Sequence, residues 1–131
     1  MAGLTLDSGA LIAADRNDPR LWLMIRAAAD DGTPVTVPTV AIVQAWRGGT
    51  RSANLARLLA GCAVDALDAR QARVGGELLG RTRTSDAVDA AVVVSAASRG
   101  DAILTTDPVD LRVLAASMPG TGPIIDLSAI R

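Results

Sequence analysis

Short apolar runs alternate with helical patterns along the whole chain of 131 residues. The apolar runs predict strands, because Gly, Pro or Asp bounds them. They are LTL at 4–6, VTV at 35–37, AVDAL at 63–67, AILTT at 102–106 and PIIDL at 123–127. Helical patterns separate them, with starts and stops marked by Pro, Ser, Asp and Gly. This alternation predicts one α/β domain over 1–131, with a mostly parallel sheet covered by helices on both faces.

The helix after the second strand contains a neutral amide among apolar residues. The sequence TVAIVQAW occupies 39–46, and we expect Pro38 to be the first residue of a helix that stops at Gly48 and Gly49. Val40, Ala41 and Gln44 share one stripe of that helix. We therefore expect Gln44 to point toward the body of the protein.

Two acidic residues directly follow predicted strands. Asp7 comes after the strand at 4–6, and Asp107 comes after the strand at 102–106. Ligands of parallel sheets bind beyond the carboxyl ends of the strands, so both acids lie at the expected functional edge. Each acid is equally placed to cap the helix that follows it. The sequence leaves both interpretations open.

A further pair of acids begins the long helix predicted over 85–100, which Ser85 or Thr84 can cap. Asp86 and Asp89 are three residues apart and share a face, which continues with apolar side chains. Asp86 is near enough to the helix start to complement the helix dipole. Asp89 is deeper, and an ionised carboxylate on an apolar face needs a partner or a cation.

Composition excludes several classes of site. The chain has no His, Lys, Phe or Tyr, one Cys (Cys62), and a net charge of −1. Without an imidazole there is no Ser-His-Asp or Cys-His catalysis, and neither a zinc site of His or Cys ligands nor a phosphate-binding loop with its Lys can form. No apolar stretch is long enough to span a membrane and no export signal is recognisable, so we expect a cytoplasmic protein.

Taken together, four stretches resemble the PIN-domain ribonucleases, and among them the VapC-type toxins of toxin–antitoxin pairs. They are LDSGALIAA at 6–14, VPTVAIVQAWR at 37–47, DAVDAAVVVSAASRG at 86–100 and ILTTDPVDL at 103–111. Their order and spacing match over nearly the whole chain. The resemblance implies a PIN-like three-layer α/β/α fold.

It also implies a Mg²⁺ or Mn²⁺ site built from four acids. Three of them match Asp7, Asp89 and Asp107, while Asp86 and Asp110 match accessory acids. The second acid is normally a Glu, and its place is held here by Gln44, which can ligate through its oxygen but carries no charge. Three explanations stay open: an inactivating substitution, a divergence that still works, or a member of the family that binds and does not cut.

Clustered carboxylates with a divalent cation have a definite chemistry. The cation relieves their mutual repulsion, lowers the pKa of a bound water and screens a phosphodiester. We therefore expect a divalent-metal-dependent endoribonuclease that hydrolyses RNA with a metal-activated water and leaves, by the resemblance, a 5′ phosphate. Thr105 or Thr106 can orient a ligand. The alternative is a non-catalytic PIN-fold module that binds antitoxin or RNA, and a third possibility is an unrelated α/β domain whose acids are only caps.

Two kinds of binding partner are expected, RNA from the positions of the arginines and an antitoxin from the family resemblance. Four arginines flank the expected site and can bind RNA phosphates, or can simply be solvated: Arg47, Arg51, Arg81 and Arg83. Trp46 can stack on a base or pack at an interface. The resemblance implies a homodimer and a cognate antitoxin whose tail covers the site. An apolar groove lined by LWLMIRAAA at 21–29 would suit that tail.

Overall fold

The strands form one five-stranded sheet with the order β3-β2-β1-β4-β5 in the computed structural model, which describes residues 2–130. All neighbouring strands are parallel, so the sheet predicted as mostly parallel is parallel throughout. The strands are β1 (Leu4–Leu6), β2 (Val35–Pro38), β3 (Ala63–Asp65), β4 (Ala102–Thr105) and β5 (Ile124–Asp126). The α-helices are α1 (Ser8–Asp15), α2 (Pro19–Asp30), α3 (Thr39–Ala45), α4 (Ala53–Ala60), α5 (Ala69–Thr82), α6 (Ala87–Arg99) and α7 (Pro108–Ala116).

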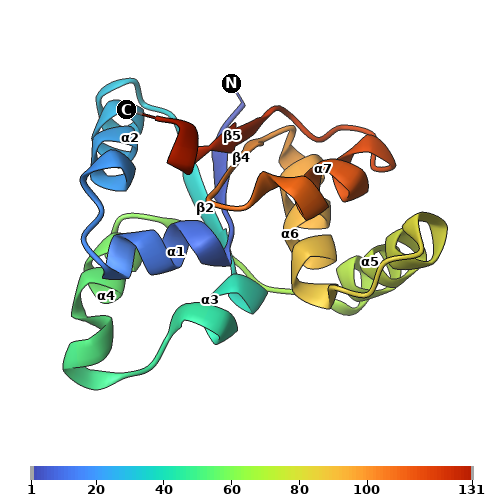
Figure 1. The fold of residues 1–131 in the computed structure, drawn as a ribbon, viewed down its shortest axis with the longest axis horizontal. Coiled ribbons are helices and arrows are strands. Elements are labelled where there is room, and N and C mark those ends of the chain that lie inside the picture. The colour runs from blue at the N-terminus through green and yellow to red at the C-terminus, as the bar shows by residue number, and fades with distance from the viewer. Residues whose placement is uncertain (1, 131) are drawn as a thin grey trace.

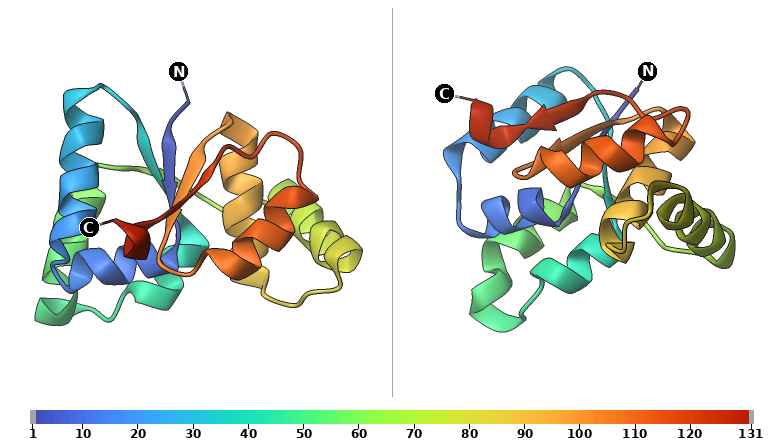
Figure 2. Two further views of the ribbon diagram at one scale, coloured as in Figure 1. Left: turned by 45° about the horizontal axis from the view of Figure 1, so that its top comes forward. Right: turned by 45° about the vertical axis from the view of Figure 1, so that its right-hand side comes forward.

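The helices lie in two layers, one on each face of the sheet. α1, α2 and α4 lie on one side and α5, α6 and α7 on the other (Figures 1 and 2). This division follows from handedness: crossovers between parallel strands are right-handed, so connections that run along the sheet in opposite directions cover opposite faces. The chain moves from β1 to β2 in one direction and from β4 to β5 in the other.

The core lies between the central strands and the helices that cover them. β1 and β4 are covered on both faces, which explains why their apolar residues run without alternation. Within residues 2–130, no helix is both long enough and apolar enough to cross a bilayer. The side chains at the centre of the core include Leu6, Leu11, Val37, Val92, Val93, Ile103 and Leu104.

Three local predictions at helix ends were wrong: the start and the end of α3, and the cap of α6. Pro38 is the last residue of β2 and precedes α3, because its backbone is extended, with φ −66° and ψ 138°. α3 then ends at Ala45, since Trp46 is also extended and stops the helix before Gly48 is reached. The cap of α6 is Asp86, whose carboxylate accepts the Asp89 N–H at 2.9 Å, in place of Ser85 or Thr84.

The predicted strand at 63–67 is shorter than expected. β3 ends at Asp65 and lies at the edge of the sheet, where Val64 is 52% exposed. Leu67 has already left the strand, and its N–H donates to the Thr39 hydroxyl at 3.2 Å.

Candidate metal centre

The carboxyl ends of β1 and β4 lie side by side, and we call the region beyond them the crevice, by analogy with other open parallel sheets. These strands are neighbours, and the chain leaves them toward opposite faces of the sheet, which is where open parallel sheets bind ligands. Asp7 directly follows β1, and Asp107 follows β4 after one intervening residue. Topology therefore brings these two predicted acids to one place.

Asp7 is a helix cap and a member of the crevice at the same time. Its side chain is buried, with one oxygen accepting the Ala10 N–H at 2.9 Å and the other accepting the Thr105 hydroxyl at 2.5 Å. Burial raises the pKa of Asp7 above its ordinary value, and the hydrogen bonds from Thr105 and Ala10 only partly oppose this. The Thr105 hydroxyl also accepts the Asp107 N–H at 3.0 Å, so one residue of β4 positions both acids.

The pKa of Asp89 indicates that several carboxylates lie near one another. Its pKa is raised to about 7, first because the side chain is half-buried and then because other acids repel its charge. Asp86 caps the same helix, and the other three acids come from two further segments, at the starts of α1 and α7. Their repulsion acts on Asp89 without direct contact. In decreasing order of effect they are Asp86, Asp7, Asp110 and Asp107.

The remaining acids are more exposed. Asp86 uses one oxygen to cap α6, which leaves the other without an assigned hydrogen bond among residues 2–130. Asp107 precedes α7 but makes no capping hydrogen bond through its side chain, so capping does not account for it. Asp110 lies in the first turn of α7. We therefore call the buried Asp7 the base of the crevice and the exposed acids its rim.

Gln44 does not point into the body of the protein, which corrects the prediction from the helix stripe. The buried positions of α3 are Ala41 and Ala45, and Gln44 lies beside this narrow apolar face with an exposed side chain. Among residues 2–130, no hydrogen bond holds its amide. Its helix packs between α1 and α6, the helices that begin beside Asp7 and Asp89 (Figure 1). Gln44 therefore lies on a helix that borders the crevice, and its exposed side chain can change its rotamer.

The carboxylates of the crevice are suitable ligands for a hard divalent cation, both in their oxygen donors and in their negative charge. All donors are carboxylate oxygens, which Mg²⁺ and Mn²⁺ prefer. Burial is the main reason that the pKa of Asp7 and of Asp89 is raised, and repulsion from neighbouring acids adds to it, so a cation beside them would favour their charged forms. Within residues 2–130, however, no three His, Cys, Asp or Glu side chains are close enough together to hold one ion as they stand. Binding therefore requires the exposed acids to turn inward.

The four predicted RNA-binding arginines are exposed but do not share one location. Arg47 and Arg51 lie between α3 and α4, and the Arg47 guanidinium donates to the Trp46 carbonyl at 2.8 Å. Arg81 donates to the Ser117 carbonyl at 3.2 Å, at the end of α7 that lies away from Asp107. Arg83 ends α5 in the left-handed conformation, with φ 55°.

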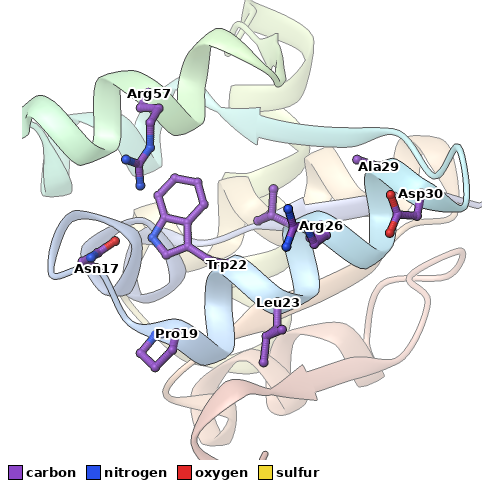
Figure 3. A pocket seen from close by; sticks show the side chains of 9 residues that line it. Asn17, Pro19, Trp22, Leu23, Arg26, Ala29, Asp30 and Arg57 are labelled. Carbon is purple, nitrogen blue, oxygen red and sulfur yellow. The ribbon is translucent and has the colours of Figure 1, made fainter.

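Both tryptophans are near surfaces. Trp46 is 41% exposed, so it is not a core residue. Trp22 lines a cavity of about 700 Å³ beside α2 (Figure 3). Leu23, Arg26 and Ala29 of the same helix and Arg57 of α4 line it as well. The Arg57 guanidinium lies 4.4 Å from the centre of the indole ring. The indole N–H of Trp22 is buried without an acceptor among the described residues.

Comparisons with known proteins show the fold. No protein-family model matches the chain, and no curated protein matches it. Solved structures do match, among them VapBC2 from Rickettsia felis bound to a DNA fragment from their promoter, with a TM-score of 0.71 and 11% identity over 91% of this chain and 95% of that one. DNA-bound VapBC from Salmonella typhimurium gives a TM-score of 0.69 and 19% identity, over 97% of this chain and 99% of that one. PAE2754 from Pyrobaculum aerophilum gives 0.62 and 20%, over 97% and 92%. This chain therefore has the PIN-like fold that the family resemblance implied.

Proposed function

We propose that this chain, whose fold is PIN-like, is a divalent-metal-dependent endoribonuclease of the toxin–antitoxin type with a weakened metal site. One observation carries the proposal: repulsion from four other acids helps to raise the pKa of Asp89 to about 7 at the switch point of a parallel sheet. A cluster of like charges opposes folding unless a cation or a partner neutralises it. The likeness to VapBC structures supports the same assignment.

Asp7, Asp89 and Asp107 would hold the ion, with Asp86 as a further ligand at the rim. Mg²⁺ or Mn²⁺ supplies a positive charge against the phosphodiester and acidifies water. Thr105 keeps the carboxylate of Asp7 in place while its hydroxyl fixes the backbone of Asp107. The burial of Asp7 excludes water from the base of the crevice and makes its charge more effective.

A non-cleaving binding module is the second candidate, and Gln44 favours it. The amide is exposed and makes no hydrogen bond among residues 2–130. It adds no charge to the acids, and within the same residues no three of the possible metal-ligand side chains lie close enough together to hold an ion. Such a chain would keep its partner surface and lose its chemistry. Cleavage of RNA by the chain and by its Gln44→Glu variant, with Mn²⁺ or with a chelator, separates the two candidates.

The partner in this proposal is an antitoxin segment on the cavity between α2 and α4. The cavity follows the residues at 21–29 that the sequence indicated. It combines an apolar floor with the positive charges of Arg26 and Arg57 and the negative charge of Asp30 (Figure 3). The buried indole N–H of Trp22 needs an acceptor, which a peptide carbonyl or a carboxylate can provide. A homodimer stays a prediction from the resemblance.

In a complex with its antitoxin, the indole N–H of Trp22 should therefore gain a hydrogen bond. We expect its proton resonance to shift downfield and its exchange with solvent to slow, both measured by NMR on the free chain and on the complex. The indole of Trp46 is the internal reference. If the Trp22 resonance and its exchange rate are the same in both samples, the partner binds elsewhere.

A further inference from the structure

A second cavity begins at the crevice and extends along α1. Its volume is about 390 Å³. One side of it is a single helical face, because Ile12, Ala13 and Arg16 lie three, four and seven residues after Gly9. This face starts two residues after Asp7 and covers about 10 Å of helix. The residues that line it are Gly9, Ile12 and Ala13 of α1, Arg16 directly after it, Asp18 and Arg20 at the start of α2, and Thr106 after β4.

Gly9 connects this cavity with the carboxylate of Asp7. A Cβ atom at position 9 would lie 2.4 Å from the Thr106 hydroxyl oxygen, so α1 approaches the end of β4 as closely as only glycine allows. The same position is 3.4 Å from a carboxylate oxygen of Asp7. Gly9 therefore lies close to both Thr106, which lines the cavity, and Asp7, the buried acid.

Arg16 provides a free positive charge in this cavity. Its side chain is exposed, and no hydrogen bond or ion pair engages it among residues 2–130. Arg20, in contrast, is paired with Asp18 through two hydrogen bonds, of 3.1 and 2.8 Å, so these two charges cancel locally. The net charge of the lining is that of Arg16.

We infer that this cavity binds a backbone phosphate of single-stranded RNA next to the phosphate at the carboxylates. The inference rests on the proposed function and assigns the path of the strand, along α1 and past Thr106 toward Arg16. Arg16 is the positioning residue, because a guanidinium makes forked contacts with a phosphate. Arg47, Arg51, Arg81 and Arg83 are not part of this path.

Equilibrium binding of a pool of random-sequence, single-stranded RNA tests the inference. The measurement uses fluorescence anisotropy in EDTA, so that neither metal binding nor cleavage contributes, and covers a range of salt concentrations. We compare the chain with Arg16→Gln and Arg16→Lys. Arg73→Gln is the matched control, because Arg73 is an exposed arginine on α5, at the opposite side of the molecule from α1 (Figure 1).

Arg16→Gln should weaken binding about three- to tenfold at low salt and reduce the slope of log affinity against log salt by about 0.7, the contribution of one phosphate contact on a single strand. Arg16→Lys should keep the slope, and Arg73→Gln should keep both quantities. If Arg16→Gln and Arg73→Gln bind alike, the phosphate subsite is wrong, while RNA cleavage by the chain would still support the proposed function. If the unaltered chain binds no RNA at any salt concentration, the phosphate subsite is wrong, and cleavage with Mn²⁺ decides separately on the proposed function.

Discussion

Replacing Gln44 by Glu should raise the rate of Mn²⁺-dependent RNA cleavage by about 10- to 100-fold, the range typical of one outer-shell contact at a metal site. The amide and the carboxylate have nearly the same shape, so the variant adds a charge without new bulk. Gln44 is exposed and lies on α3, between the helices that begin at Asp7 and Asp86, so a carboxylate there can turn into the crevice. A further negative charge strengthens the attraction for a divalent cation.

Two controls make this assay specific to the site. Val43→Glu adds the same charge one position earlier, on a side chain that is 76% exposed, and should leave the rate unchanged. The double variant Gln44→Glu/Asp7→Ala should lose the activity, because Asp7 lies at the base of the crevice. Equal rates for the chain and Gln44→Glu would mean that Gln44 is a tolerated divergence. No cleavage by either protein would favour the binding module.

Replacing Arg99 by Met should cost about 3 kcal/mol of the free energy of unfolding, the low end of the range for breaking a buried ion pair, because Asp101 is buried while Arg99 is partly exposed. The Arg99 guanidinium donates to Asp101 at 2.9 Å and to Asp65 at 3.1 Å. It also donates to the hydroxyls of Thr5 and Ser95, both at 3.0 Å. These contacts join β1, β3 and α6, so the residue holds the helix that carries Asp89 against the sheet.

The cost arises mainly from the carboxylate left behind. Asp101 is 2% exposed, and without Arg99 its charge keeps only the hydrogen bonds from the Gly3 N–H and the Thr5 hydroxyl. The double variant Arg99→Met/Asp101→Asn should therefore be more stable than Arg99→Met alone. Arg112→Met, at an exposed position of α7, is the control and should change stability by no more than about 0.5 kcal/mol. Urea denaturation measures all three, and equal stability of Arg99→Met and Arg112→Met would contradict this account.

Much of the fold could be predicted because strand and helix patterns are local. The five apolar runs became the five strands, and their parallel order followed from the helices between them. The positions of Asp7 and Asp107 could be predicted for the same reason, since topology alone brings the carboxyl ends of β1 and β4 together. The depth of Asp89 followed from helical spacing, and its pKa of about 7 fits an acid that needs a partner.

What could not be predicted depends on packing between distant segments. The direction of Gln44 was wrong because α3 is short and buries only a narrow face, at Ala41 and Ala45. The sequence left Thr105 and Thr106 equivalent, whereas the structure places the hydroxyl of Thr105 on Asp7. The cavity along α1 was missed. The spacing of Gly9, Ile12, Ala13 and Arg16 is visible in the sequence, but the facing wall at Thr106 and Asp18 requires the fold.

The central claim is that the acids of this crevice form one divalent-cation site, and calorimetric titration of the chain with Mn²⁺ tests it most directly. A carboxylate must lose its proton to bind the ion, so affinity should be highest above pH 7 and fall as the pH drops through the pKa of Asp89, about 7. Asp7→Asn should weaken binding at least about tenfold, and Asp30→Asn, on an exposed acid of α2, should not. One bound ion with this dependence on Asp7 is the predicted result. Absence of binding, or binding that Asp7→Asn and Asp30→Asn affect equally, would contradict the account.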